Sequence, residues 1–103
     1  MNSENEAYLK LLRALGIIGS KWNILIIWIL KDETLRFSVL QKKMGDVNSK
    51  TITKHLKDLE KNKIVTRTVY PEVPPRVEYT LTEQGLRLVP ICEEIWKWGE
   101  TLT

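Results

Sequence analysis

Apolar residues recur every three or four positions along the first third of the chain, which is the spacing of helices. A helix is predicted over residues 5–18. Its apolar face includes Tyr8, Leu11, Leu12 and Leu15. Gly19 weakens the end of this helix, and Ser20 can cap the next one. The second helix is predicted over residues 21–31, and because it is apolar nearly all round, we expect it to be buried at the centre.

The middle of the chain has the pattern of two helices joined by a short turn. A very short strand is predicted at residues 35–37, followed by a short helix over residues 38–44. A turn that contains a glycine then leads to a second helix, which begins at a cap on Asn48 or Ser49. We interpret this succession, over about residues 38–62, as a helix-turn-helix.

After the helix-turn-helix, apolar residues recur at every second position instead of every third or fourth, which is the spacing of strands. Three prolines within residues 71–75 exclude regular pairing there and stiffen the connection. We therefore expect a two-stranded hairpin over about residues 64–81, with a rigid tip. Thr82 then caps a last helix over residues 83–101, in which Pro90 is predicted to cause a kink.

Length and composition are those of one small domain. The chain has 103 residues and a mass of 12.0 kDa, and 43% of its residues are hydrophobic. Its elements predict a single α+β domain, mostly α, over residues 1–103. The most apolar run has seven residues, far short of the roughly 20 that a membrane helix needs. The N-terminus also lacks the pattern of a secretory signal, so a cytoplasmic protein without membrane contact is expected.

Positive charge is concentrated in the middle of the chain. The net charge of the whole sequence is only +3. Residues 36–67 contain nine basic and three acidic residues, a net charge of +6, which leaves −3 for the remainder. A basic centre between acidic ends is typical of an element that binds a polyanion and is carried on a near-neutral scaffold.

The second helix of the helix-turn-helix has two opposite faces. At about 100° per residue, Ile52, Leu56 and Leu59 fall within one narrow arc. The opposite arc holds four lysines, namely Lys50, Lys54, Lys57 and Lys61. Lysines are common on solvated faces, but an ordinary exposed face would also contain acidic residues that form i,i+4 pairs. We therefore interpret this lysine stripe as a nucleic-acid-binding surface.

The dimensions of DNA assign roles to this helix. A B-DNA major groove admits one helix, whose N-terminal residues reach the base edges. We predict base contacts from the residues of the first turns, namely Ser49, Lys50, Thr51, Thr53 and Lys54. Lys57 and Lys61 are predicted to meet phosphates.

Arg76, at the hairpin tip, is a candidate for a contact with a phosphate or the minor groove. Glu72 lies on the same tip and disfavours deep insertion, so a backbone contact is preferred. An ion pair of Arg76 with Glu72 or Glu78 is an equally open alternative.

Several motifs along the chain share the pattern of one protein family. They are Gly19-Ser20-Lys21-Trp22, Arg36-Phe37-Ser38, Thr51-Ile52-Thr53 with Leu56 and Leu59, Val65-Thr66-Arg67, and residues 70–83 with Gly85. Together they resemble the HxlR-type winged helix-turn-helix regulators, which are broadly similar to MarR-type proteins. The resemblance implies a homodimeric transcriptional regulator that binds DNA, with the hairpin as its wing. It also implies that the first and last helices form the dimer.

The last helix agrees with a dimer because it has two apolar stripes. One stripe contains Leu88, Ile91, Ile95, Trp98 and Leu102, and the other contains Val89, Cys92 and Trp96. One stripe suffices for a monomer's core, so two indicate a partner, although both could be buried within one chain. The predicted dimer interface comprises Tyr8, Leu11, Leu12, Leu88, Ile91, Ile95 and Trp98. A two-fold dimer would bind a pseudo-palindromic operator in double-stranded DNA.

Candidate chemistry elsewhere in the sequence is sparse. The chain has one cysteine and one histidine, and we find no nucleophile–base pair, glycine-rich phosphate loop or metal-spaced cluster. We therefore expect neither an enzyme nor a bound metal or cofactor. Two alternatives remain open, a winged helix that binds proteins and a nonspecific architectural DNA binder. A small-molecule effector is also left open.

The position of the cysteine departs from the family's pattern. Many HxlR-type proteins carry a cysteine near the start of the first helix, and some use it to sense thiol-reactive compounds. The equivalent position here is Leu9, so redox sensing by that route is unsupported. Cys92 lies on an apolar stripe, where a thiol ionises poorly. His55 borders the buried face of its helix and is expected to be a partly packed side chain.

Overall fold

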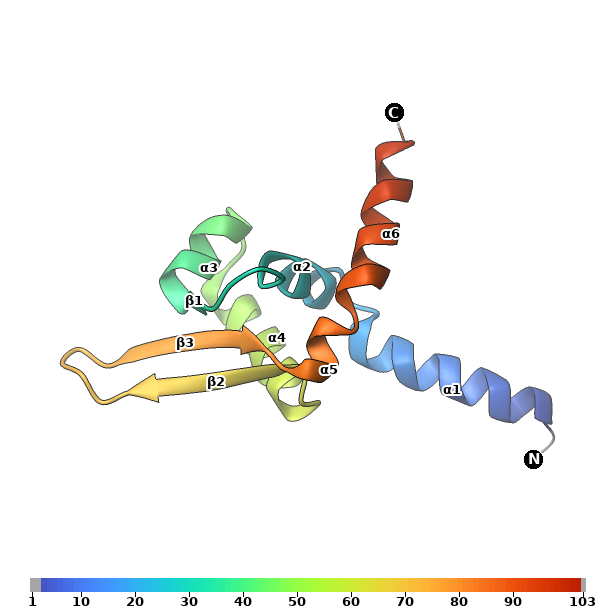
Figure 1. The fold of residues 1–103 in the computed structure, drawn as a ribbon, viewed down its shortest axis with the longest axis horizontal. Coiled ribbons are helices and arrows are strands. Elements are labelled where there is room, and N and C mark those ends of the chain that lie inside the picture. The colour runs from blue at the N-terminus through green and yellow to red at the C-terminus, as the bar shows by residue number, and fades with distance from the viewer. Residues whose placement is uncertain (1–2, 103) are drawn as a thin grey trace.

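The computed structural model of the protein describes residues 3–102 (Figure 1). Its elements are, in chain order, α1 (Ser3–Ile18), α2 (Lys21–Ile29), β1 (Leu35–Arg36), α3 (Phe37–Met44), α4 (Ser49–Lys61), β2 (Val65–Tyr70), β3 (Arg76–Leu81), α5 (Glu83–Leu86) and α6 (Val89–Glu100). The predicted fold class, a mostly helical α+β chain with a helix-turn-helix followed by a wing hairpin, is confirmed.

The core is built around α2, which contacts α1, α3, α4 and α6. Ile26 and Ile27 of α2 are completely buried, as are Leu40 of α3 and Ile52 and Leu59 of α4. This arrangement explains why α2 is apolar nearly all round, since it has neighbours on several sides. Helix α4 packs on this core from one side and therefore has its opposite face free.

The sheet has three antiparallel strands in the order β1-β3-β2. The predicted hairpin is formed by β2 and β3, in which Val65 is opposite Leu81 and Arg67 is opposite Tyr79. The predicted short strand is β1, and it pairs with the free edge of β3 through Leu35 and Tyr79. The wing is therefore joined to the start of α3 as well as to the end of α4.

The prediction of one last helix over residues 83–101 with a kink at Pro90 is wrong. The structure has two helices, because α5 ends at Leu86 and α6 begins at Val89. Pro90 lies in the first turn of α6, where the N–H that proline lacks has no partner within the helix. Pro90 therefore begins a helix rather than bending one.

The base of the wing holds α5 in place. The Oγ1 atom of Thr82 accepts a hydrogen bond from the backbone N–H of Gly85 at 3.0 Å and donates to the carbonyl oxygen of Lys63 at 2.6 Å. A Cβ atom at Gly85 would overlap the carbonyl oxygen of Ile64, so only glycine allows this approach. This contact holds α5 against the base of the wing.

Helices α1 and α6 extend away from the body of the molecule in different directions (Figure 1). Between residues 6 and 102, no single helix is both long and apolar enough to cross a membrane. Residues Glu6–Ile18 and Lys21–Ile29 reach that length and composition only as a pair, and the pair is bent by 66°.

Candidate nucleic-acid interface

Helix α4 begins at Ser49 because Asn48 caps it. The Oδ1 atom of Asn48 accepts a hydrogen bond from the backbone N–H of Lys50 at 2.7 Å. The carbonyl oxygen of Asn48 accepts the N–H of Ile52 at 3.1 Å, the first turn of the helix. Of the two caps that the sequence allowed, Asn48 is the one observed.

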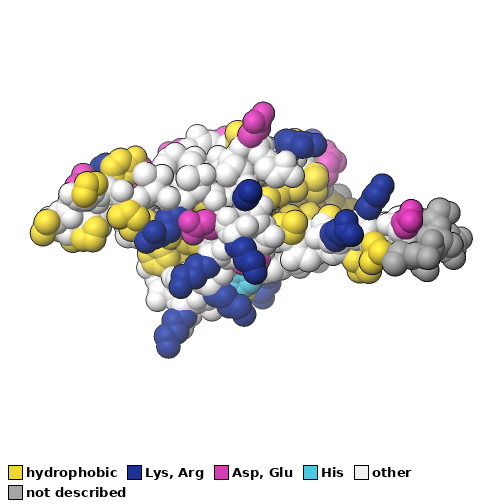
Figure 2. Space-filling view, turned by 90° about the horizontal axis from the view of Figure 1, so that it is seen from below, with side chains coloured by type: hydrophobic (Ala, Val, Ile, Leu, Met, Phe, Trp, Pro, Cys, Tyr) yellow, Lys and Arg dark blue, Asp and Glu magenta, His cyan; other side chains and the backbone are white. Residues whose placement is uncertain are grey.

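The two faces of α4 are separated as the sequence predicts. Ile52, Leu56 and Leu59 are at most 1% exposed. The four lysines on the opposite side, Lys50, Lys54, Lys57 and Lys61, are all exposed. Figure 2 shows Lys and Arg side chains gathered on this face around the single histidine, drawn in cyan.

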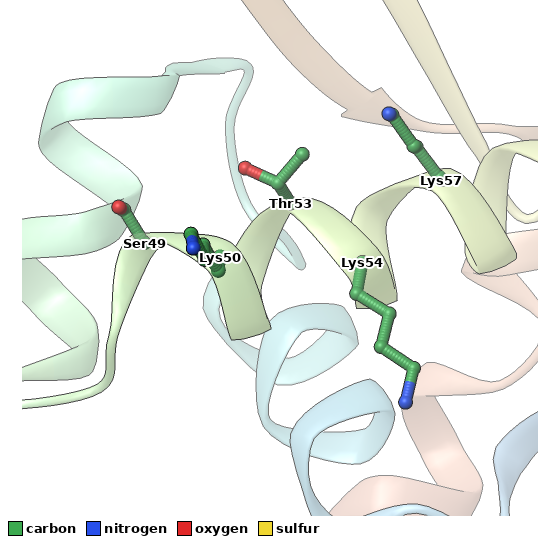
Figure 3. A pocket seen from close by; sticks show the side chains of 5 residues that line it. All are labelled: Ser49, Lys50, Thr53, Lys54 and Lys57. Carbon is green, nitrogen blue, oxygen red and sulfur yellow. The ribbon is translucent and has the colours of Figure 1, made fainter.

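Five of the predicted DNA-contacting residues line one shallow groove on the outer face of α4. They are Ser49, Lys50, Thr53, Lys54 and Lys57 (Figure 3). Thr51 is half-buried and does not line this groove, whereas Lys61 lines a neighbouring hollow together with Lys54, His55, Lys57 and Asp58. In Figure 3, Thr53 and Lys57 lie on one side of the helix and Lys54 on the other. We call the groove of these five residues the recognition groove.

Ion pairs among the side chains that the structure describes, those of residues 6–102, do not neutralise the positive charge of this region. The cations that form ion pairs in this range are Lys31, Arg76 and Lys97. None of the nine basic residues between positions 36 and 67 is among them. Their charges are therefore available to an external anion.

Arg76 has two ion-pair partners. Its Nη2 atom is 3.5 Å from Oε1 of Glu72, and its Nε atom is 3.3 Å from Oε2 of Glu78. Its guanidinium group also lies over the Tyr70 ring, 4.1 Å from the ring centroid. Both ion pairs considered as the alternative for Arg76 are therefore present, and a contact of Arg76 with DNA stays a prediction.

A polar network joins α4 to the end of α1 through Asn23 of α2. Asn23 is only 2% exposed, and its Nδ2 atom donates to the carbonyl oxygen of Ile17 at 2.8 Å and to Oδ2 of Asp58 at 3.1 Å. Its Oδ1 atom is 2.9 Å from Nδ1 of His55. Because Oδ1 only accepts, this contact places the proton of neutral His55 on Nδ1. The Oγ atom of Ser20 lies 3.5 Å from the same nitrogen.

We did not select Asn23 from the sequence. The available signal was a polar residue within an otherwise apolar helix, where a buried amide must be hydrogen-bonded. Two partners of that amide, His55 and Asp58, lie on α4, which is more than thirty residues away along the chain. The sequence therefore marks the position as unusual without naming its partners.

The Asn23→Ala substitution tests the energetic role of this network. It removes the partner of the Ile17 carbonyl, the Asp58 carboxylate and the His55 ring together. Because these groups are half-buried and each loses a hydrogen-bond partner, we expect the free energy of unfolding to fall by about 1–3 kcal/mol. Chemical denaturation measures the loss. Gln84→Ala, which changes an exposed amide, is the control, and an equal loss in both variants would contradict this role of Asn23.

Cys92 lies on the core side of α6 and is 3% exposed. Burial raises the pKa of its thiol, so the group stays protonated at neutral pH and is a poor nucleophile. It lines an apolar hollow of 260 Å³ between α2 and α6, together with the stacked rings of Trp28 and Trp96. The described contacts of Cys92 are those of a small apolar side chain.

The residues predicted at the dimer interface are mostly exposed in the single chain. Tyr8, Leu11 and Leu12 of α1 have 62%, 59% and 61% of their surface exposed. Ile91, Ile95 and Trp98 of α6 are also exposed. Leu88 differs from these six residues, because it is half-buried and packs against the core. The six exposed residues of the predicted interface thus lie on the two helices that extend from the body.

Comparison with known proteins identifies the family. The model of the HxlR-like helix-turn-helix family matches residues 17–103. The chain belongs to this family. The resemblance seen in the motifs is therefore confirmed, and the HxlR-like chain is a helix-turn-helix protein of the transcriptional-regulator kind.

Individual relatives agree with this assignment. An uncharacterized HTH-type transcriptional regulator of Halalkalibacterium halodurans is 44% identical over 86 residues, which cover 82% of this chain and 76% of that protein. Another, from Methanothermobacter thermautotrophicus, is 42% identical over 87 residues, covering 84% of this chain and 66% of the relative. A solved structure from Porphyromonas gingivalis, assigned to the MarR family of transcriptional regulators, is similar with a TM-score of 0.86 and 33% identity. That similarity covers 90% of this chain and 91% of the other.

Proposed function

We propose that this HxlR-like protein regulates transcription by binding specific sites in double-stranded DNA as a homodimer. The observation that carries the proposal is the exposed lysine face of α4, which is free of ion pairs among the described residues and lies opposite the core face of the helix. A helix of this kind fits a DNA major groove, where its positive side chains replace the counterions of the phosphates.

Each part of α4 has a role in this proposal. Ser49, Lys50, Thr53 and Lys54 belong to the first turns, and their side chains can donate to purine edges or touch a thymine methyl group. Thr51 borders this set. Lys57 and Lys61 lie further along the helix, where they would contact phosphates and set affinity rather than sequence preference.

The wing would lie beside the DNA backbone. Arg76 is held by Glu72 and Glu78, so a phosphate must replace at least one of these carboxylates for Arg76 to contact DNA. This exchange makes the electrostatic contribution of Arg76 smaller than that of the unpaired lysines.

A homodimer is supported by the apolar surface of α1 and α6. Tyr8, Leu11 and Leu12 on α1 and Ile91, Ile95 and Trp98 on α6 would be covered by a second copy, next to the core-packed Leu88. Such a dimer would present two α4 helices to a pseudo-palindromic operator. We further propose that the protein acts by binding rather than by catalysis, and that it does so in the cytoplasm, where chromosomal DNA is accessible to it.

Selection from a random duplex DNA pool tests the proposed function. The protein is incubated with the pool at physiological salt and excess competitor DNA, and the retained DNA is sequenced. We expect an enriched inverted repeat whose half-sites are about one helical turn apart. Retention without an enriched motif would favour an architectural DNA binder instead. No retention would point to a protein partner on the apolar helices.

Removing Lys57 and Lys61 tests the assignment of phosphate contacts. The Lys57→Ala and Lys61→Ala variants are each expected to weaken binding to all duplexes alike. Each should also lower the slope of log affinity against log salt concentration by about 1.8, since one phosphate contact is lost in each of the two protomers. Filter binding at several salt concentrations measures both quantities.

Lys97→Ala is the matched control, because Lys97 is already paired with Glu93 and Glu94. We expect its salt slope to equal that of the unchanged protein. A changed sequence preference with an intact slope in Lys57→Ala would instead assign Lys57 to base contacts.

A further inference from the structure

A second hollow adjoins the recognition groove on the side of the wing. It has a volume of 250 Å³ and lies between α4 and the sheet. Its lining residues are Thr53, Lys57 and Glu60 of α4, Arg67 of β2 and Tyr79 of β3. Thr53 and Lys57 also line the recognition groove, so the two hollows share a wall. We call this second hollow the α4–wing cleft.

Arg67 lies on the face of β2 that is turned toward the core. It is directly opposite Tyr79, and directly opposed residues of antiparallel strands share one face of the sheet. Val65, two residues earlier on the same face, and its partner Leu81 are both buried. The alternation along β2 therefore places a charged, exposed arginine at a position where an apolar side chain would be expected.

Two cations from different elements converge on this cleft. Neither Lys57 nor Arg67 forms an ion pair with any of the described side chains, those of residues 6–102. Glu60 lines the same cleft, but no ion pair joins it to either cation. Thr53 and Tyr79 carry hydroxyl groups that can donate to an oxyanion. A guanidinium and an ammonium beside hydroxyl groups are suited to a phosphate group.

We propose that the α4–wing cleft binds one phosphate of the DNA backbone, with Arg67 as its principal ligand and Lys57 as the second. This assignment rests on the proposed function, because it needs α4 in the major groove. The cleft opens beside the recognition groove, where the strand that borders the major groove must pass. A phosphate bound in this cleft would fix the wing side of the domain on the duplex. It would thereby set the orientation of α4 relative to the base edges in the major groove.

The salt dependence of DNA affinity distinguishes a phosphate ligand from a structural residue. Arg67→Ala is expected to weaken binding roughly tenfold and to lower the salt slope by about 1.8, because the substitution is present in both protomers of the dimer. Arg67→Lys keeps the charge and should retain the slope.

Glu60→Gln removes a negative charge from the cleft and should strengthen binding several-fold, a gain that misfolding cannot produce. Arg87→Ala, directly after α5 and outside the cleft, is the control and should bind as the unchanged protein does.

Replacing single DNA phosphates by uncharged methylphosphonates identifies the phosphate that the cleft binds. In duplexes with one methylphosphonate at a time, we expect one position in each half-site that weakens the unchanged protein roughly threefold, half of the free-energy loss of Arg67→Ala, and that has no further effect on Arg67→Ala. An unchanged salt slope in Arg67→Ala, or the absence of such a position, would overturn the proposal. If Arg67 only protects the edge of β2, Arg67→Ala would self-associate without a change in slope. A failure of the proposed function can be distinguished from a failure of the cleft proposal. It would be seen with the unchanged protein, when selection from the random DNA pool enriches no operator. Phosphate binding is then still measurable on random duplex DNA.

Discussion

Leu12→Glu in α1 and Ile95→Glu in α6 are each expected to give a folded monomer whose affinity for a two-half-site operator is lower by about 10² to 10⁴-fold. Both side chains are exposed in the single chain, at 61% and 48%, so the substitutions should cost the fold of one protomer little. In a dimer the same positions would be covered by apolar surface, and a carboxylate buried there without a partner costs several kcal/mol. The monomer then loses the simultaneous contact with two half-sites.

Light scattering and DNA titration measure the two parts of this result. The unchanged protein should have twice the chain mass of 12.0 kDa, and each variant the mass of one chain. Affinity for a duplex with a single half-site should change little, which separates dissociation from unfolding. Glu94→Gln, an exposed substitution on α6, is the control and should remain dimeric. Dimeric mass in both glutamate variants would place the interface elsewhere.

Leu56→Ala is expected to lower the free energy of unfolding by about 2–5 kcal/mol. Leu56 is 1% exposed and belongs to the same core cluster as Ile27 of α2 and Leu40 of α3. Truncation leaves a cavity under α4 that the surrounding helices fill only in part. Because domains of this kind are stable by only about 5–15 kcal/mol, the loss is a large share of the total.

Thermal and chemical denaturation measure the effect of Leu56→Ala. The matched control is Lys57→Ala, the next residue along α4 but on its exposed face, whose effect on stability should stay within about 0.5 kcal/mol. The two variants should therefore affect different properties, because Leu56→Ala lowers the stability of the protein and Lys57→Ala lowers its affinity for DNA. Equal losses of stability would contradict the division of α4 into a core face and a DNA face.

The parts of the fold that follow from local patterns were predictable. The separation of Ile52 and Leu56 from the lysines requires only the helical period, because one side of a surface helix must face the core. The wing hairpin similarly follows from a period of two and a proline-rich connection. Helix α4 carries all five residues of the recognition groove, so these residues could be selected before the fold was known.

The structural features that the sequence pattern did not predict depend on contacts between residues that are distant in the chain. The placement of α5 against the base of the wing depends on the contact of Gly85 with Ile64 and on the hydrogen bond of Thr82 to Lys63, about twenty positions earlier. Pro90 alone gave no means of distinguishing a kink from a helix start. The alternation around Arg67 was visible, but its importance depends on α4 lying against that face of β2.

The opposition of the two faces of α4 has a consequence for the evolution of this family. The side chains that hold the helix in place and those proposed to select DNA sequence are different residues, so one set can change while the other is kept. A duplicated copy of the protein could acquire a new operator by substitutions at Ser49, Lys50, Thr53 and Lys54, all outside the buried core, without first losing its fold. The same separation makes these four positions a natural choice for a library of altered DNA specificity.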